Sequence, residues 1–106
     1  MLTIDYNSRY SIRRTSAFDD WMAGLPDART RVRLAKRLAR FELGLPGDTV
    51  HVGAGVFEMR EFFGPGWRMY FTFRGRHMVV LLAGGDKSTQ RQDIARAIEL
   101  AGTIED

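Results

Sequence analysis

A short turn between two aromatic runs constrains the fold of this chain more than any other feature. Gly64, Pro65 and Gly66 separate the run 56–63 from the run 67–74, and a further glycine ends the second run before a third at 77–84. All three runs are rich in β-branched and aromatic residues, which favour strands. Because the connections are short, we expect an antiparallel meander of three strands. The third run is apolar at both alternating sets of positions, which is typical of an interior strand covered on both faces.

Side chains along the first two runs alternate between apolar and polar. A three-residue loop places Phe63 opposite Trp67, and the same register places Arg60 opposite Tyr70. A loop of two or four residues would exchange the two faces, and the coherent alternation favours three. One face is then apolar and packs on a core, and we expect the other to be open. The open face carries Glu58, Arg60, Arg68, Tyr70, Thr72 and Arg74.

Two helices are predicted before this sheet. The first begins at the N-cap candidate Ser16 and stops at Pro26. Asp27 caps the second, which Gly44 and Pro46 close. Two side-chain stripes run along the second helix: an apolar one of Leu34, Leu38, Phe41 and Leu45, and a cationic one of Arg29, Arg33, Lys36, Arg37 and Arg40.

Both ends of the chain add elements to this plan. Residues 1–8 read as an extended or partly disordered lead into a strand at 9–14, which we expect to return to the sheet edge. After the third run, Asp86, Ser88 or Thr89 can cap a last helix, with Thr89 and Gln92 at capping-box spacing. The prediction is a single α+β domain over 1–106, with two N-terminal helices and a C-terminal helix packed on a small, mainly antiparallel sheet.

Composition excludes several functional classes. The 106 residues carry 16 Lys and Arg against 13 Asp and Glu, and they include no cysteine, which excludes disulfides and thiol chemistry. No stretch has the ~20 apolar residues of a membrane span, and the opening residues contain no signal-peptide core. His51 and His77 lack metal-ligand spacing, and no phosphate-binding or serine-hydrolase motif is present. We therefore expect a cytoplasmic protein that uses no metal or other cofactor.

The polar sheet face supports two interpretations. It can be an ordinary solvated face on which glutamates neutralise arginines. Alternatively it can bind phosphate, since Arg60 and Arg68 offer bidentate donors and Tyr70 a ring on which an RNA base can stack. Lys87 favours the second interpretation, because it follows the third strand at the start of a helix, where an anion is stabilised. The cationic stripe of the second helix is weaker evidence of the same kind.

Four segments together resemble one family, and they cover about residues 12–101 in order. They read FDDWMAGLPD, RTRVRLAKRLARFELGLPGD, VGAGVFEMREFFGPGWRMYF and VVLLAGGDKSTQRQDIARA. The chain resembles the RelE/ParE superfamily of toxins from bacterial toxin–antitoxin modules, and within it the phage-derived Gp49-like or HigB-like addiction module killer proteins. Met59, Trp67 and Met69 replace other apolar or aromatic residues of the family pattern.

The resemblance implies a toxin that a cognate helix-turn-helix antitoxin holds inactive. It also implies cleavage of mRNA on the ribosome without a metal, by attack of a 2′-hydroxyl on the adjacent phosphate. Arg60, Arg68, Tyr70 and Lys87 match the family's polar positions and are the catalytic candidates. We expect Arg68→Ala to abolish cleavage without disturbing the fold. Further RNA or phosphate contacts are expected from Arg74, Arg33, Lys36, Arg37 and Arg40.

Two other functions fit the same resemblance. Some members of the superfamily inhibit DNA gyrase with the same fold, so the fold does not choose between the two targets. A third reading is a non-catalytic module that only binds its antitoxin. Loss of mRNA would indicate the ribonuclease, supercoiling defects the gyrase inhibitor, and no effect on growth the non-catalytic module.

Overall fold

Five strands form one mixed sheet in the computed structural model, which describes residues 9–104; the predicted lead at 1–8 lies outside this range. The strand order is β1-β5-β4-β3-β2. Strand β1 runs parallel to β5, and the other neighbours are antiparallel. The elements in chain order are β1 (Ser11–Arg14), α1 (Ser16–Ala23), α2 (Ala28–Glu42), β2 (Thr49–Gly53), β3 (Val56–Arg60), β4 (Trp67–Arg74), β5 (Met78–Asp86), a 3₁₀ turn (Lys87–Thr89) and α3 (Gln90–Thr103).

This architecture confirms the α+β prediction, the meander of β3, β4 and β5, and the return of the first strand to the sheet edge. It adds strand β2, which the sequence analysis missed. The β2–β3 connection turns at Ala54 and Gly55, both with positive φ (51° and 76°). Hairpins of this kind are usually signalled by Asn-Gly or Asp-Gly, so an alanine at the first position hides the turn.

The helices begin where side chains satisfy free backbone N–H groups. Asp27 caps α2 as predicted, by accepting a hydrogen bond from the Arg29 N–H at 3.0 Å. Helix α1 is capped by Thr15 and not by Ser16. The Thr15 hydroxyl accepts a hydrogen bond from the Phe18 N–H at 3.2 Å and donates one to the Leu81 carbonyl of β5 at 2.9 Å. The predicted capping box at α3 does not form, since Thr89 donates to the Asp93 carboxylate instead.

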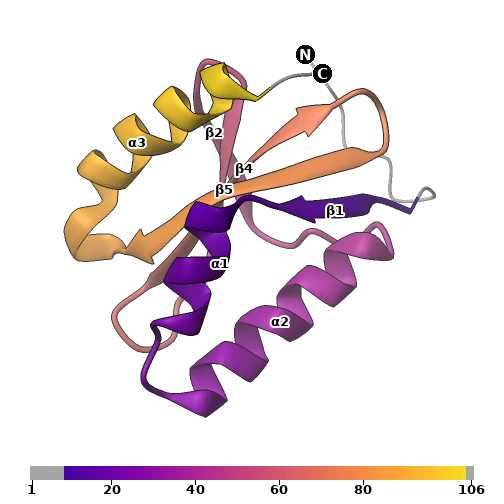
Figure 1. Cartoon of the computed structure of the whole chain (residues 1–106). Coiled ribbons are helices and arrows are strands. Elements are labelled where there is room, and N and C mark those ends of the chain that lie inside the picture. The colour runs from indigo at the N-terminus through magenta and orange to yellow at the C-terminus, as the bar shows by residue number, and fades with distance from the viewer. Residues whose placement is uncertain (1–8, 105–106) are drawn as a thin grey trace.

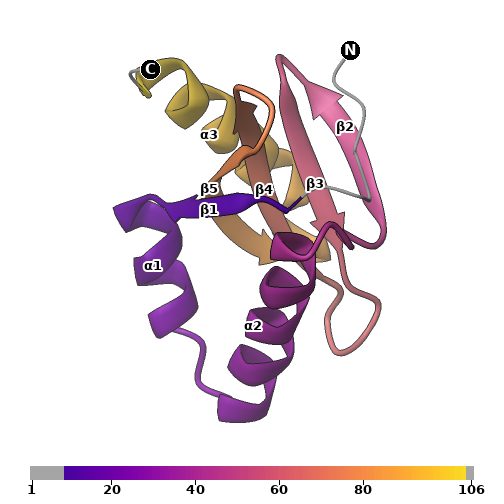
Figure 2. The ribbon, with the colours of Figure 1, turned by 90° about the vertical axis from the view of Figure 1, so that its right-hand side faces the viewer.

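The sheet separates two apolar cores, with α1 and α2 on one side and α3 on the other (Figure 1, Figure 2). Phe18, Leu34 and Phe41 pack from the helices onto Met69 and Phe71 in the first core. The second core joins α3 to the opposite sheet face through Val56, Tyr70, Val80, Leu82, Ala97 and Ala101. Leu45, which was placed on the apolar stripe of α2, lies beyond the helix end and is 52% exposed.

Two expectations about the hairpin are wrong. Arg60 pairs with Arg68, and Glu58 pairs with Tyr70, so the register differs by two residues from the predicted one. A hydrogen bond from the Glu61 N–H to the Trp67 carbonyl leaves a loop of five residues, 62–66. Since five and three are both odd, the two faces are assigned correctly. The polar face is not open, however, because α3 covers much of it.

Candidate nucleic-acid interface

The β3–β4 loop is held in one shape by the side chain of Arg68. Its Nη1 atom donates to the carbonyls of Glu61, Gly66 and Trp67, each at 3.1 Å. Gly64 and Gly66 have positive φ values of 56° and 81°, which glycine adopts without strain. With 6% of its surface exposed, Arg68 therefore shapes the loop from inside.

The two phenylalanines of the loop point in different directions. Phe63 packs against the core on the α1 and α2 side, and the guanidinium of Arg33 lies 3.8 Å from its ring centroid. Phe62 is 74% exposed. Its ring centroid lies 5.8 Å from the Arg60 guanidinium and 5.9 Å from that of Arg68, within the range of cation–π attraction. Phe62 was not among the sequence candidates; two adjacent aromatic residues at a strand end, where neighbours face opposite ways, are the signal that could have identified it.

Arg60 is half-buried and oriented by Asp48, which follows α2 in the loop before β2. The guanidinium donates from Nε and Nη2 to the two carboxylate oxygens, at 3.1 and 3.0 Å. This side-chain hydrogen bonding with Asp48 raises the pKa of Arg60. A fork-to-fork pair of this kind fixes the plane of the guanidinium while its remaining donors stay available to a ligand.

Lys87 reaches the same loop from the far end of β5. It is exposed and follows Asp86, whose carboxylate accepts a hydrogen bond from the Ser88 N–H at 2.8 Å. A Cβ atom built on Gly66 would lie 3.4 Å from the Lys87 Cβ and 3.5 Å from Arg68 Nη1. Gly66 thus lies between these two residues. We call the half-buried Arg60 and the exposed Phe62 and Lys87 around this loop the loop surface.

Tyr70 lies in the interior, contrary to the expectation that its ring faces a base. Its exposure is 0%, because α3 covers this part of the sheet. Burial first, and the neighbouring Glu58 carboxylate second, raise the pKa of Tyr70. Glu58 is itself 2% exposed; it accepts a hydrogen bond of 2.8 Å from Gln90 of α3, and its Oε1 lies 3.7 Å from Arg68 Nε. In this conformation Tyr70 cannot stack on a base.

The remaining predicted phosphate ligands do not gather in one place. Arg37 was predicted on the cationic stripe of α2, but it is 4% exposed and makes hydrogen bonds within the protein, so it does not share the exposed side of the helix with Lys36. Arg74 lies at the opposite end of β4, where its Nη2 donates to the Ala101 carbonyl at 2.8 Å. Lys36 and Arg40 are exposed on α2. Of the arginines assigned to RNA binding, Arg33 contacts the loop through Phe63, and the buried Arg37 contacts Glu61 where the loop begins.

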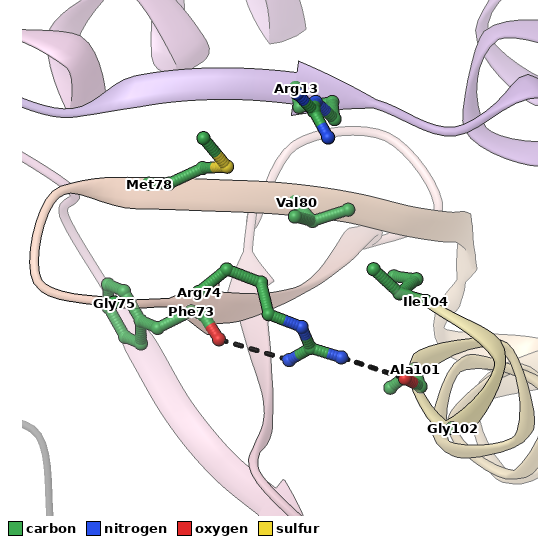
Figure 3. A pocket seen from close by; sticks show the side chains of 9 residues that line it. All are labelled: Arg13, Phe73, Arg74, Gly75, Met78, Val80, Ala101, Gly102 and Ile104. Atoms are coloured by element: carbon green, nitrogen blue, oxygen red, sulfur yellow. Dashed lines mark hydrogen bonds between the residues drawn. The ribbon is translucent and has the colours of Figure 1, made fainter. Parts of the chain in front are cut away.

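Two clefts lie away from the loop surface. One, of about 830 Å³, is formed by β1, β4, β5 and the end of α3, with Arg13, Met78, Val80 and Ile104 among its lining residues (Figure 3). In that view Arg74 extends from β4 to the Ala101 carbonyl. The second, of about 430 Å³, lies beside the β2–β3 turn and is lined by His51 and Phe57. Neither cleft includes Arg60, Phe62 or Lys87.

Within residues 9–104, no group of three or more histidine, aspartate or glutamate side chains is arranged to hold a metal ion. The same part of the chain contains no helix that is long and apolar enough to cross a membrane. The loop surface itself offers the cations and hydrogen-bond donors of Arg60 and Lys87 and the aromatic ring of Phe62.

Comparisons with solved structures place this fold in a known class. The chain is similar to a mutant of the E. coli toxin RelE in the free state, with a TM-score of 0.67 and 12% identity, over 86% of this chain and 96% of that one. It is also similar to the RelBE2 toxin–antitoxin complex of Mycobacterium tuberculosis, with a TM-score of 0.55 and 22% identity, over 74% of this chain and 99% of that one. The protein thus has the RelE fold.

Sequence comparison then assigns the family. The model of the phage-derived Gp49-like proteins matches residues 20–103, and the chain belongs to this family. An uncharacterized protein of Haemophilus influenzae is 40% identical over 90 residues, which are 85% of this chain and 91% of that protein. These findings confirm the Gp49-like and RelE-like parts of the predicted resemblance.

Proposed function

We propose that this protein is the toxin of a toxin–antitoxin module and that it cleaves mRNA bound to the ribosome. Membership in the Gp49-like family and the RelE fold support the first part of the proposal. The second part depends on one observation: Arg60 of β3 and Lys87 after β5 flank a loop whose carbonyls are held by the buried Arg68 of β4. Phosphate is the ligand that such a group of donors suits.

The proposed reaction is an internal transfer that consumes no water and no cofactor. The 2′-hydroxyl oxygen attacks the adjacent phosphorus, the bond from phosphorus to the 5′-oxygen breaks, and the proton of the hydroxyl is passed to the leaving oxygen. The products are a 2′,3′-cyclic phosphate and a 5′-hydroxyl. Because DNA has no 2′-hydroxyl, this chemistry requires RNA.

Each candidate residue takes a role that its exposure permits. Arg60 offers free guanidinium donors to the phosphate oxygens, on which negative charge increases in the transition state. Lys87 is a phosphate ligand, or the group that moves the proton. Arg68 is a positioning residue, because it is buried and its Nη1 holds the loop carbonyls. Tyr70 remains a prediction without an assigned step, since its ring is enclosed.

Cleavage of mRNA on programmed ribosomes tests this proposal. Arg60→Ala and Lys87→Ala should each lower the cleavage rate by about 10²–10³-fold, the usual effect of removing one preorganised charge-stabilising donor. Both side chains are on the surface, so the melting temperature should change little. Arg76→Ala is the matched control, because Arg76 is exposed in the turn between β4 and β5, at the other end of the sheet. Equal rates for all three variants would exclude the loop surface as the active site.

A parallel assay addresses the rival target. If the protein inhibits DNA gyrase, it should block supercoiling of plasmid DNA and leave ribosome-bound mRNA intact. That outcome would replace the ribonuclease proposal and keep the toxin assignment. Inactivity in both assays, together with normal growth of cells that express the chain alone, would favour a non-catalytic module.

We further propose that the toxin works in the cytoplasm and is neutralised there by a helix-turn-helix antitoxin. The similar RelBE2 structure is that of a toxin–antitoxin complex, which supports a protein partner of this kind. Coexpression with the product of the adjacent gene tests the proposal. A stable complex should form, and cell growth should recover. Unchanged growth inhibition and no copurification would contradict it.

A further inference from the structure

Phe62 is an unusual surface residue. Among residues 9–104 it is the most exposed large apolar side chain, at 74%, followed by Val32 at 53%. Single exposed apolar residues are common on soluble proteins, so exposure alone assigns no role. What distinguishes Phe62 is the structure that holds it in place and the charges that surround it.

The loop holds the Phe62 ring in solvent by fixing both neighbouring segments. Phe63 is packed inward beneath Arg33, and the Gly66 N–H donates to the Phe63 carbonyl at 3.1 Å. Arg68 Nη1 ties together the carbonyls on either side of the loop. A ligand that stacks on Phe62 would therefore meet a ring that is already ordered, and little conformational entropy would be lost on binding.

Two guanidinium groups border the ring. Arg60 and Arg68 are direct cross-strand partners, an arrangement that is normally destabilising for like charges. Each lies within 6 Å of the Phe62 centroid, and Lys87 approaches the loop at Gly66. An aromatic face next to several cations suits a ligand that has a flat ring and a phosphate, as in the stacking sites of proteins that bind single-stranded RNA.

A protein partner is the other class of ligand that could cover Phe62. Strong protein contacts usually place an anchor side chain in a deep, desolvated pocket. A projecting ring has the shape of such an anchor, but the core of a protein interface is depleted in charged residues, lysine among them. Phe62 is bordered by two guanidinium groups, and Lys87 approaches its loop, which fits an unpaired base and its phosphate better than an apolar anchor.

We propose that Phe62 binds an unpaired base of the substrate RNA by stacking and so determines which nucleotide lies next to the phosphate held by Arg60 and Lys87. This inference rests on the proposed ribonuclease function. It makes Phe62 a substrate-positioning residue: stacking tolerates any base, so the ring sets which phosphate of the strand is cut, a role that the reaction chemistry itself does not require.

The test uses ribosomes programmed with a set of mRNAs, each of which carries 2-aminopurine at a different position of the codon in the ribosomal A site. A 2′-O-methyl group blocks cleavage in the fluorescence experiment, and unmodified mRNA reports the rate. The wild-type protein should quench the fluorescence at one codon position, since stacking quenches 2-aminopurine. Phe62→Leu keeps the apolar volume and loses the ring, so it should abolish this quenching and lower kcat/KM about tenfold or more. Phe62→Tyr should retain both.

Leu43→Ala is the control, because Leu43 is 52% exposed at the end of α2 and does not belong to the loop surface. It should behave as wild type, and all variants should melt at the same temperature. Wild-type cleavage with an unaffected Phe62→Leu variant would overturn the inference and leave the ribonuclease proposal standing. Slower cleavage with unchanged quenching would also overturn it. If the wild-type protein cleaves no mRNA, the ribonuclease proposal fails, and the inference fails with it.

Discussion

The carboxylate of Glu61 accepts a hydrogen bond of 3.0 Å from the guanidinium of Arg37, which is only 4% exposed. The same guanidinium donates to the carbonyls of Pro46, Asp48 and Arg60, at 2.7, 2.8 and 2.9 Å. Arg37 therefore joins α2 to the end of β3, at the point where the β3–β4 loop begins. Its planar fork of donors suits several acceptors at once.

Arg37→Ala should lower the free energy of unfolding by about 3–5 kcal/mol, because it leaves a partly buried carboxylate and several carbonyls without their donor. Arg37→Lys should not restore stability, since one ammonium group cannot reach all of these acceptors. Urea denaturation measures both. Arg40→Ala, on the exposed side of the same helix, should stay within about 0.5 kcal/mol of wild type. Equal effects at the two positions would contradict this role of Arg37.

Gly84 and Gly102 should respond in opposite ways to alanine. A Cβ atom on Gly84 would lie 2.2 Å from the Trp21 ring, so the packing of α1 on β5 must shift, at a cost of about 1–3 kcal/mol or more. A Cβ atom on Gly102 meets nothing within 4 Å in α3, and alanine there should stabilise the protein by up to about 1 kcal/mol. Thermal unfolding of the two variants compares them. Unchanged stability of the Gly84→Ala variant would show that the Trp21 ring moves aside at little cost.

The buried pair of Glu58 and Arg68 predicts a non-additive double mutant. Arg68→Ala should cost about 3–5 kcal/mol in unfolding free energy, because the buried Glu58 side chain would lose its cationic partner and retain the Gln90 amide as its hydrogen-bond donor. The expectation that Arg68→Ala leaves the fold intact therefore gives way to one of destabilisation. Replacing both residues, with Glu58→Gln and Arg68→Ala, should cost less than the sum of the losses caused by the two single replacements. Additive losses in a urea double-mutant cycle would contradict coupling between the two side chains.

The helix cap at Asp27 should make stability depend on acid pH. The backbone N–H of Arg29, followed by the Thr30 hydroxyl, lowers the pKa of Asp27 below its usual value of 3.8. A carboxyl group whose pKa is lower in the folded protein than in the unfolded chain stabilises the folded state. This stabilisation is complete at pH values above the unfolded-state pKa, and it is lost as the pH falls through the folded-state pKa.

Asp27→Asn keeps an acceptor and removes the charge, so it isolates the ionic part of this effect. Asp27→Asn should melt below wild type at pH 7, and the difference should shrink as the pH falls below about 3.8. Asp20→Asn, an exposed acid of α1 outside the cap, is the control. A difference that is constant from pH 7 to pH 2 would show that the Asp27 charge does not act through the cap.

Local patterns predicted most of the fold. Periodicity, the Asp27 cap and the glycine turns indicated three helices and the meander, because each of these depends on residues close together in the chain. The edge position of the first strand was predicted from the order of the elements, since its pairing with β5 joins distant residues. Strand β2 was missed because it is short, half-exposed and followed by an atypical Ala54–Gly55 turn. The family could likewise be predicted from the order of four short segments.

What the sequence determined by itself is which residues alternate on each sheet face, and that arginines would come together at the β3–β4 hairpin. Tertiary structure decided which of these side chains are exposed. Helix α3 covers Glu58 and Tyr70, Arg68 turns inward to close a five-residue loop, and Arg37 is buried against the end of β3. Each outcome depends on contacts between residues distant in the chain, and a local pattern of polarity carries no information on them. Two adjacent aromatic residues at a strand end indicate that one ring faces away from the core, but the folded chain shows that this ring is Phe62 and that two guanidinium groups lie next to it.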